Sequence, residues 1–323
     1  MRLMLYIVRF LLLAWIALLS QSAYAADTGL SESHGDKSPR VSRLTTISHP
    51  TKSHRRGKHA RSIPAEPANH KVLNVMSNAA LVLNVQNGEV IFSKKDTLVS
   101  SIASITKLMT AMVVIDGKQS LDERITLTTE DIDHLKNTGS RLAIGTSLTR
   151  EDMLRLALMS SENRAASALG RNYPGGLSSF VKQMNLKAEA LGMKQSTFVD
   201  SSGLSKNNVS TAQDLAKMVQ AAYQYPLVRQ FTTGTDYSLR TSNGRTLAYH
   251  NTNPLIRRPD WHIELSKTGY ISEAGPCLVM RTVISGTPMV IVLLDSWGRM
   301  SRAGDANRIK HWIDAHSEVL KLG

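Results

Sequence analysis

The stretch Ser104-Ile105-Thr106-Lys107 places a hydroxyl and an ammonium group three residues apart at the start of a predicted helix, so both side chains share one face. A serine hydroxyl is a weak nucleophile until a base removes its proton. A lysine can be that base only if burial or a second positive charge lowers its pKa. The spacing alone is weak evidence, because Ser179-Phe180-Val181-Lys182 repeats it with nothing matching around it.

A second string, Ser161-Glu162-Asn163, falls in a predicted break between two helical segments, where side chains can point into a cleft. The Ser161 hydroxyl can relay a proton to a leaving amine, and the Asn163 amide can hold a substrate carbonyl. We expect Glu162 to face away, in a salt bridge. Ser205-Lys206-Asn207 has the same spacing, so this string is also weak by itself.

A third string, Lys267-Thr268-Gly269, occurs once, on a predicted edge strand. Lys267 and Thr268 can bind a terminal carboxylate, and Lys267 can supply the second positive charge for the lysine base. Gly269 has no side chain, so substrate backbone can pair with the strand. Together, in this order, the three strings indicate a serine acyl-transfer site that needs no metal and no cofactor.

The hydrophobic pattern predicts strands at both ends of the globular part and helices between them. The expected elements are strands at 79–85 and 90–92 around an Asn-Gly turn, a helix from 104, mostly helices and loops over 120–235, strands at 263–271, 276–284 and 288–295, and a closing helix at 306–322. The hairpins should form one antiparallel sheet, covered on its faces by the helix from 104 and the closing helix. The central helices should form a second lobe. The predicted fold class is α+β, with a cleft between the lobes.

Residues 1–25 have the pattern of a secretory signal peptide, with Arg2 and Arg9, an apolar run over 10–19 and the cleavage site Ala23-Tyr24-Ala25. No later segment is long and apolar enough to cross a membrane, so we expect no transmembrane anchor after cleavage. The formal net charge of +13 would suit a polyanion as partner. Export from the cytoplasm argues against nucleic acid as that partner.

Residues 26–71 have no hydrophobic periodicity and carry nine Lys and Arg against four Asp and Glu. Such a composition cannot bury enough apolar surface to order itself, so we predict a disordered basic linker. We expect it to contact an anionic envelope polymer. Five of the ten histidines lie here, which leaves a metal-binding tract as an alternative, although their spacing is irregular. The globular domain is predicted over 72–323.

Cys277 is the single cysteine, so no internal disulfide can form. It lies in the apolar stretch Pro276-Cys277-Leu278-Val279-Met280 and should pack as a small hydrophobic residue. No set of Cys and His residues indicates a metal site.

Over about 75–315 the chain resembles the low-molecular-mass penicillin-binding proteins of the D-alanyl-D-alanine peptidase family, and within them the endopeptidases of the penicillin-binding protein 7 type. Besides the three strings, the resemblance rests on 102–112, 158–166, Asn172-Tyr173-Pro174-Gly175-Gly176, Gly203-Leu204-Ser205, 208–212 and Asn251-Thr252-Asn253. It implies a β-lactamase/transpeptidase-like fold, with peptidoglycan stem peptides as substrate and β-lactams as inhibitors.

The resemblance also implies roles for single residues. Ser104 would be the acylated nucleophile and Lys107 the base, with Ser161 in proton relay and Asn163 in substrate binding. Lys267, with Thr268 and Gly269, would form the carboxylate site. The backbone N–H groups of Ser104 and Tyr270 would form the oxyanion hole.

The sequence is compatible with three functions. The first is a peptidoglycan endopeptidase. The second is a carboxypeptidase or β-lactamase on the same scaffold, although no Glu-x-x-Leu-Asn string of a β-lactamase lies between Ser161 and Lys267. The third is a non-enzymatic penicillin sensor. The chain ends at Gly323 without the extra β-domain and C-terminal anchor of the related carboxypeptidases, which favours a soluble periplasmic enzyme.

Overall fold

The computed structural model of this protein describes residues 73–241, 244–298 and 300–322. The predicted signal peptide at 1–25 and the predicted linker at 26–71 lie outside the described residues. Within the described ranges, no helix combines the length and apolar character that spanning a bilayer requires.

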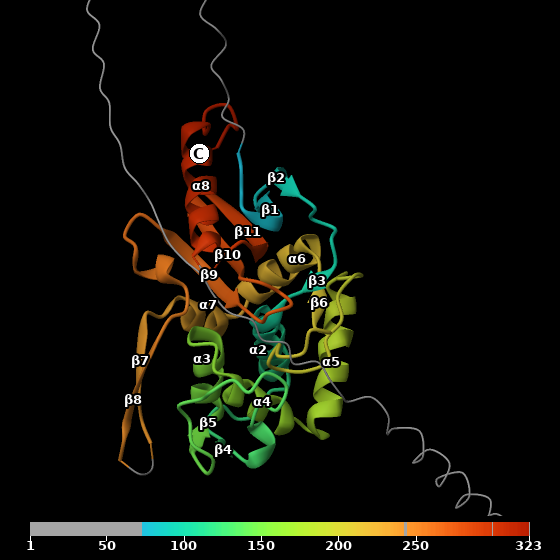
Figure 1. The fold of residues 1–323 in the computed structure, drawn as a ribbon, viewed down its shortest axis with the longest axis vertical. Helices are drawn as coiled ribbons and strands as arrows, with labels where there is room; N and C mark the ends of the chain where they lie inside the picture. Colours follow the sequence, from blue (N-terminus) through green and yellow to red (C-terminus); the bar gives the residue numbers. More distant parts are fainter. Residues whose placement is uncertain (1–72, 242–243, 299, 323) are drawn as a thin grey trace, which may run out of the picture. The chain divides into compact units, whose positions relative to one another are not determined.

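A five-stranded antiparallel sheet joins the two ends of the described chain, as the sequence predicts (Figure 1). The first strand, β1 (Ser77–Asn84), pairs with the last, β11 (Thr287–Ser296), where Val82 lies opposite Ile291. The hairpin of β1 and β2 turns through Gly88, whose φ of +75° suits a glycine. The strands follow one another in the order β2 (Val90–Lys94), β1 (Ser77–Asn84), β11 (Thr287–Ser296), β10 (Cys277–Ile284) and β9 (His262–Gly269). The third string therefore ends an edge strand, as predicted.

Helices cover both faces of this sheet. The closing helix α8 (Ser301–Ala315) packs on one face and buries Ala306, Ile309 and Ile313 against it. It begins and ends earlier than the predicted 306–322. The other face is covered by α6 (Ala212–Tyr223), which contacts β1, β10 and β11. Thr211 is the N-cap of this helix, and its side chain accepts a hydrogen bond from the backbone N–H of Asp214.

The prediction that the helix from Ser104 covers a sheet face is wrong. That segment begins with a 3-10 turn, η1 (Ala103–Ile105), and continues as α2 (Thr106–Asp116). Residues 106 to 114 of α2 are all buried. A helix buried on every side cannot lie on a sheet with one side in water. It lies instead among the other helices, in contact with α3, α4, α5, α6 and α7.

The second lobe is mostly helical, as predicted. Its helices are α3 (Arg150–Met159), α4 (Asn163–Arg171), α5 (Gly176–Ala190) and α7 (Pro226–Thr233). Shorter elements are η2 (Thr129–Asp131), η3 (Pro254–Arg257) and the strand pairs β3 (Ser100–Ser101) with β6 (Val209–Ser210), β4 (Arg124–Thr126) with β5 (Ser147–Thr149), and β7 (Asp236–Arg240) with β8 (Thr246–His250).

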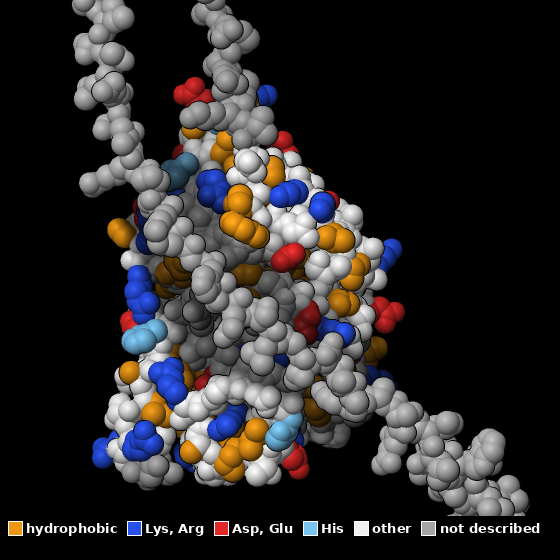
Figure 2. Space-filling model, viewed as in Figure 1, with side chains coloured by type: hydrophobic (Ala, Val, Ile, Leu, Met, Phe, Trp, Pro, Cys, Tyr) orange, Lys and Arg blue, Asp and Glu red, His pale blue; other side chains and the backbone are white. Residues whose placement is uncertain are grey.

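The β7–β8 hairpin extends beside the helical lobe, and Lys and Arg side chains lie along this side of the face in Figure 2. Arg240 and Arg245 of the hairpin are exposed. Positive charge on this face favours the approach of an anionic ligand.

Candidate active site

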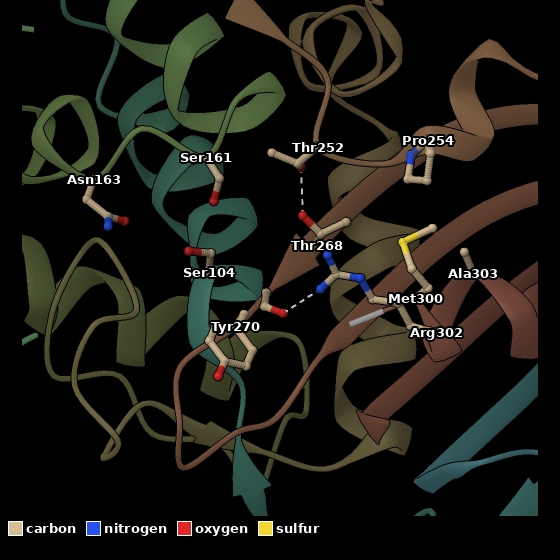
Figure 3. Close-up of a pocket in the computed structure, with 11 residues that line it drawn as sticks. Ser104, Ser161, Asn163, Thr252, Pro254, Thr268, Tyr270, Met300, Arg302 and Ala303 are labelled. Carbon is tan, nitrogen blue, oxygen red and sulfur yellow. Dashed lines mark hydrogen bonds between the residues drawn. The ribbon is translucent and has the colours of Figure 1, made fainter. Parts of the chain in front are cut away.

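Residues from all three strings meet in one cavity of about 400 Å³. Ser104 comes from η1, Ser161 from the connection between α3 and α4, Asn163 from the first position of α4, and Thr268 and Gly269 from the end of β9. Figure 3 shows Ser104 and Ser161 next to one another, with the Ser161 hydroxyl pointing toward Ser104. Its lining is completed by Thr252, Pro254, Tyr270, Met300, Arg302 and Ala303.

Lys107 lies beneath Ser104 and is fully buried. Its Nζ donates to Ser104 Oγ at 2.7 Å, to Asn163 Oδ1 at 2.8 Å and to the backbone oxygen of Ser202 at 2.6 Å. Burial disfavours the charged form and lowers the pKa of Lys107 from 10.5 to about 7, although the charges of Asp200 and Glu162 act in the opposite direction. Burial, rather than a second cation, is therefore the main cause of the low pKa.

Lys267 is the second buried lysine of the site and is 1% exposed. Its Nζ donates to Ser161 Oγ at 2.9 Å and to the backbone oxygen of Thr268, also at 2.9 Å. Burial, followed by the positive charges of Lys107 and Arg302, holds the pKa of Lys267 well below its ordinary value. Each hydroxyl of the Ser104–Ser161 pair thus accepts a hydrogen bond from its own buried lysine.

The backbone around both serines is strained. Ala103 has a φ of +47° and Ser161 a φ of +60°, a left-handed conformation that costs a non-glycine residue about 1–3 kcal/mol. Gly203 packs directly on the peptide between Ala103 and Ser104. A Cβ at Gly203 would lie 2.0 Å from the Ala103 carbonyl oxygen, so no other residue fits there. This contact with Gly203 therefore fixes the position of η1, the 3-10 turn that carries Ser104.

The loop at 200–208 supports Lys107, a role that its sequence does not predict. Asp200 accepts hydrogen bonds from the backbone N–H groups of Ser202, Gly203 and Ser205 at 2.6–2.9 Å. The buried Asn208 side chain donates to Thr106 Oγ1 at 3.1 Å and so ties the loop to α2. The Gly203-Leu204-Ser205 string was visible in the sequence, but its contact with Lys107 depends on the fold.

Arg302 is a further cation of the cavity that the sequence analysis missed. It donates to the backbone oxygens of Gly269 at 2.8 Å and Cys277 at 3.2 Å (Figure 3). Thr268 Oγ1 lies 2.7 Å from Thr252 Oγ1 beside it. No sequence signal identified Arg302, because the predicted closing helix began after it.

Cys277 is fully buried, as predicted, and burial raises the pKa of its thiol to about 11. A thiol that stays protonated is a poor nucleophile. In the part of the chain that the structure describes, no group of three or more His, Cys, Asp and Glu residues could hold a metal ion.

Known proteins share this sequence and fold. A family model described as D-alanyl-D-alanine carboxypeptidase matches residues 65–297. A D-alanyl-D-alanine endopeptidase of Pseudomonas aeruginosa is 47% identical, over 74% of this chain and 77% of its own length. One from Escherichia coli is 45% identical, over 74% of this chain and 78% of its own length.

Two solved structures are similar to this one. The Streptomyces K15 DD-transpeptidase is 26% identical, with a TM-score of 0.69 over 75% of this chain and 98% of that chain. Penicillin-binding protein D2 from Listeria monocytogenes, in its ampicillin-bound form, is 30% identical, with a TM-score of 0.64 over 74% of this chain and 98% of that chain. The chain belongs to the D-alanyl-D-alanine carboxypeptidase family, the penicillin-binding serine peptidases that its sequence resembles.

Proposed function

We propose that this protein is a peptidoglycan endopeptidase that hydrolyses the D-alanyl bond cross-linking two stem peptides, through an acyl-enzyme on Ser104. The observation that carries the proposal is the contact of Lys107 Nζ with Ser104 Oγ at 2.7 Å, made by a buried lysine whose pKa is about 7. Near pH 7 about half of the molecules hold this lysine in its neutral form, the form in which it can accept a proton as a general base.

In the first step, neutral Lys107 removes the hydroxyl proton of Ser104 as Oγ attacks the D-alanyl carbonyl carbon. The backbone N–H groups of Ser104 and Tyr270, which both line the cavity, are assigned to the developing oxyanion. Asn163 is assigned to a substrate carbonyl. This step forms the C–O bond of a tetrahedral intermediate, and the carbonyl oxygen takes up the electron pair of the C=O bond as the oxyanion.

In the second step, the C–N bond breaks and the leaving amine takes up a proton. We assign its source to Lys107: the proton taken from Ser104 passes to the amine through the hydroxyl of Ser161, which accepts a hydrogen bond from Lys267. Lys107 is then neutral again and Ser161 keeps its hydroxyl proton. A water then adds to the ester carbonyl, with Lys107 taking its proton and returning one to Ser104 Oγ as the ester breaks.

The carboxylate next to the leaving amine is assigned to Lys267, Thr268 and Arg302. Gly269 leaves the end of β9 open to substrate backbone. Two buried or part-buried cations and a hydroxyl at one end of the cavity suit an anionic group, and a carboxylate there would offset their mutual repulsion.

Two further proposals concern residues 1–71. We assign 1–25 to a signal peptide that exports the enzyme to the periplasm, so that the mature chain begins at Ala26. We assign 26–71 to a basic linker that binds an anionic envelope polymer, and 72–323 to the catalytic domain. The support is the composition: nine basic against four acidic residues.

Dimeric cross-linked muropeptides should yield monomers, and free pentapeptide should lose its last D-alanine slowly, as read by mass spectrometry.

The Ser104→Ala variant should neither cleave dimers nor be labelled by fluorescent penicillin. The Ser179→Ala variant, which changes the chance match on α5, should cleave dimers and be labelled. A carboxypeptidase, the activity in the family model's description, would release D-alanine and leave dimers intact. Penicillin labelling without cleavage of either substrate would point to a sensor.

Gly203→Ala should lower the rate of penicillin acylation at least about tenfold, because the added Cβ displaces the Ala103–Ser104 peptide. Gly88→Ala is the matched control: its φ of +75° is like the +82° of Gly203, but nothing lies within 4 Å of the added Cβ. It should cost only about 1 kcal/mol of stability and no acylation rate. Equal acylation rates in both variants would contradict the assigned contact.

A variant that begins at Val72 should cleave soluble dimers like the full-length mature enzyme but bind isolated sacculi more weakly. The difference should disappear in high salt, since screening acts over about 8 Å at physiological ionic strength. Sedimentation with sacculi at two salt concentrations measures it. Binding that is the same for both proteins would make the linker a passive spacer.

A further inference from the structure

Glu162 lies between Ser161 and Asn163 and is only 9% exposed. Its Oε1 is buried and has no hydrogen-bond partner among the described residues, and no Lys, Arg or His in this set forms a salt bridge with it. The expected salt bridge of Glu162 is therefore wrong, whereas its side chain faces away from the catalytic cavity, as predicted, since it is not part of that lining. A buried carboxylate oxygen without a hydrogen-bond partner is costly, and such an atom in a native protein calls for an explanation.

Glu162 lines a second cavity, of about 430 Å³, that adjoins the catalytic one. The two cavities share Ser161 and Asn163. In Figure 3 Asn163 lies on the opposite side of Ser104 from Arg302 and Met300. Arg302, which is assigned to the leaving-group carboxylate, does not line the second cavity. Its remaining lining consists of Gly139, Ser140, Arg141 and Ser160.

Arg141 lines the same cavity but does not pair with Glu162. Its guanidinium lies over the ring of Tyr249, 3.8 Å from the ring centre, and donates to the backbone oxygen of Ala248. The Tyr249 hydroxyl is itself buried and has no hydrogen-bond partner in the described part of the chain. The carboxylate thus remains available to a cation that enters from the cavity.

The proposed substrate carries such a cation. A cross-link joins a D-alanyl carbonyl of one stem to a side-chain amine of another, and that amine becomes a neutral amide. The stem that supplies the acyl group has an amine-bearing residue of its own, which this bond does not use. Where that residue is not cross-linked further, it is a free ammonium on the acyl side of the scissile bond.

We propose that Glu162 and its cavity form a subsite for the free ammonium group of the acyl-donor stem. The inference rests on the proposed endopeptidase function and adds a specificity-determining residue to it. A charge-assisted hydrogen bond to a nearly buried carboxylate is among the stronger single contacts that a peptide can make. It would favour donor stems whose amine is free over those whose amine is blocked.

The test compares three forms of one dimeric muropeptide: with the free amine, with that amine acetylated, and with it dimethylated. Acetylation removes the charge, whereas dimethylation keeps the charge and adds similar bulk. We expect kcat/KM of the wild-type enzyme to be roughly tenfold higher for the free and dimethylated forms than for the acetylated form.

In Glu162→Gln the ratio of free to acetylated substrate should fall to about one, and in Glu162→Asp to an intermediate value. Glu89→Gln, on the distant β1–β2 turn, should keep the wild-type ratio. Since each ratio compares two substrates on one enzyme, a general loss of activity or of folded protein cancels.

A wild-type ratio near one would overturn the subsite, and so would an unchanged ratio in Glu162→Gln. Equal losses with the acetylated and dimethylated forms would show that bulk, and not charge, decides, which also overturns it. Failure of the wild type to cleave any dimer would instead contradict the proposed endopeptidase function.

Discussion

The buried ammonium group of Lys107 is the constraint on which the rest of the site depends. An ammonium can be buried only if acceptors replace its water. Its three acceptors come from η1, from α4 and from the loop at 200–208, which are far apart in the sequence. The group that activates Ser104 thus also holds together three segments of the site. Burial makes its ammonium form a strong enough acid to lose a proton near neutral pH.

The energetic consequence of this burial is large. One unit of pKa corresponds to about 1.4 kcal/mol, so the drop from 10.5 to about 7 represents on the order of 5 kcal/mol of lost preference for the charged form. Between these two pH values the unfolded chain binds a proton that the folded chain does not. The contribution of Lys107 to stability therefore rises with pH across that window. The strained φ angles of Ala103 and Ser161 add to this cost, and the surrounding packing maintains them.

The sequence predicted the parts of this protein that depend on local pattern. Alternating and continuous apolar runs identified the strands, and the Asn-Gly turn identified the first hairpin. Three short strings identified five of the residues that line the cavity and the two buried lysines, Lys107 and Lys267. It did not predict the partners that come from distant segments. Arg302 reaches the cavity because α8 begins at Ser301, and Glu162 is buried in the short connection between α3 and α4. Neither feature leaves a periodic signal, and the same is true of the all-round burial of α2.

The most direct test of this account is the pKa of Lys107 itself. The ¹³C chemical shift of its Cε can be followed by NMR from pH 5 to 11, with the signal assigned by its loss in Lys107→Arg. The account predicts a titration midpoint near pH 7, the value that burial imposes on this lysine. A midpoint near 10.5 would show an ordinary, charged lysine, which could not take the proton of Ser104.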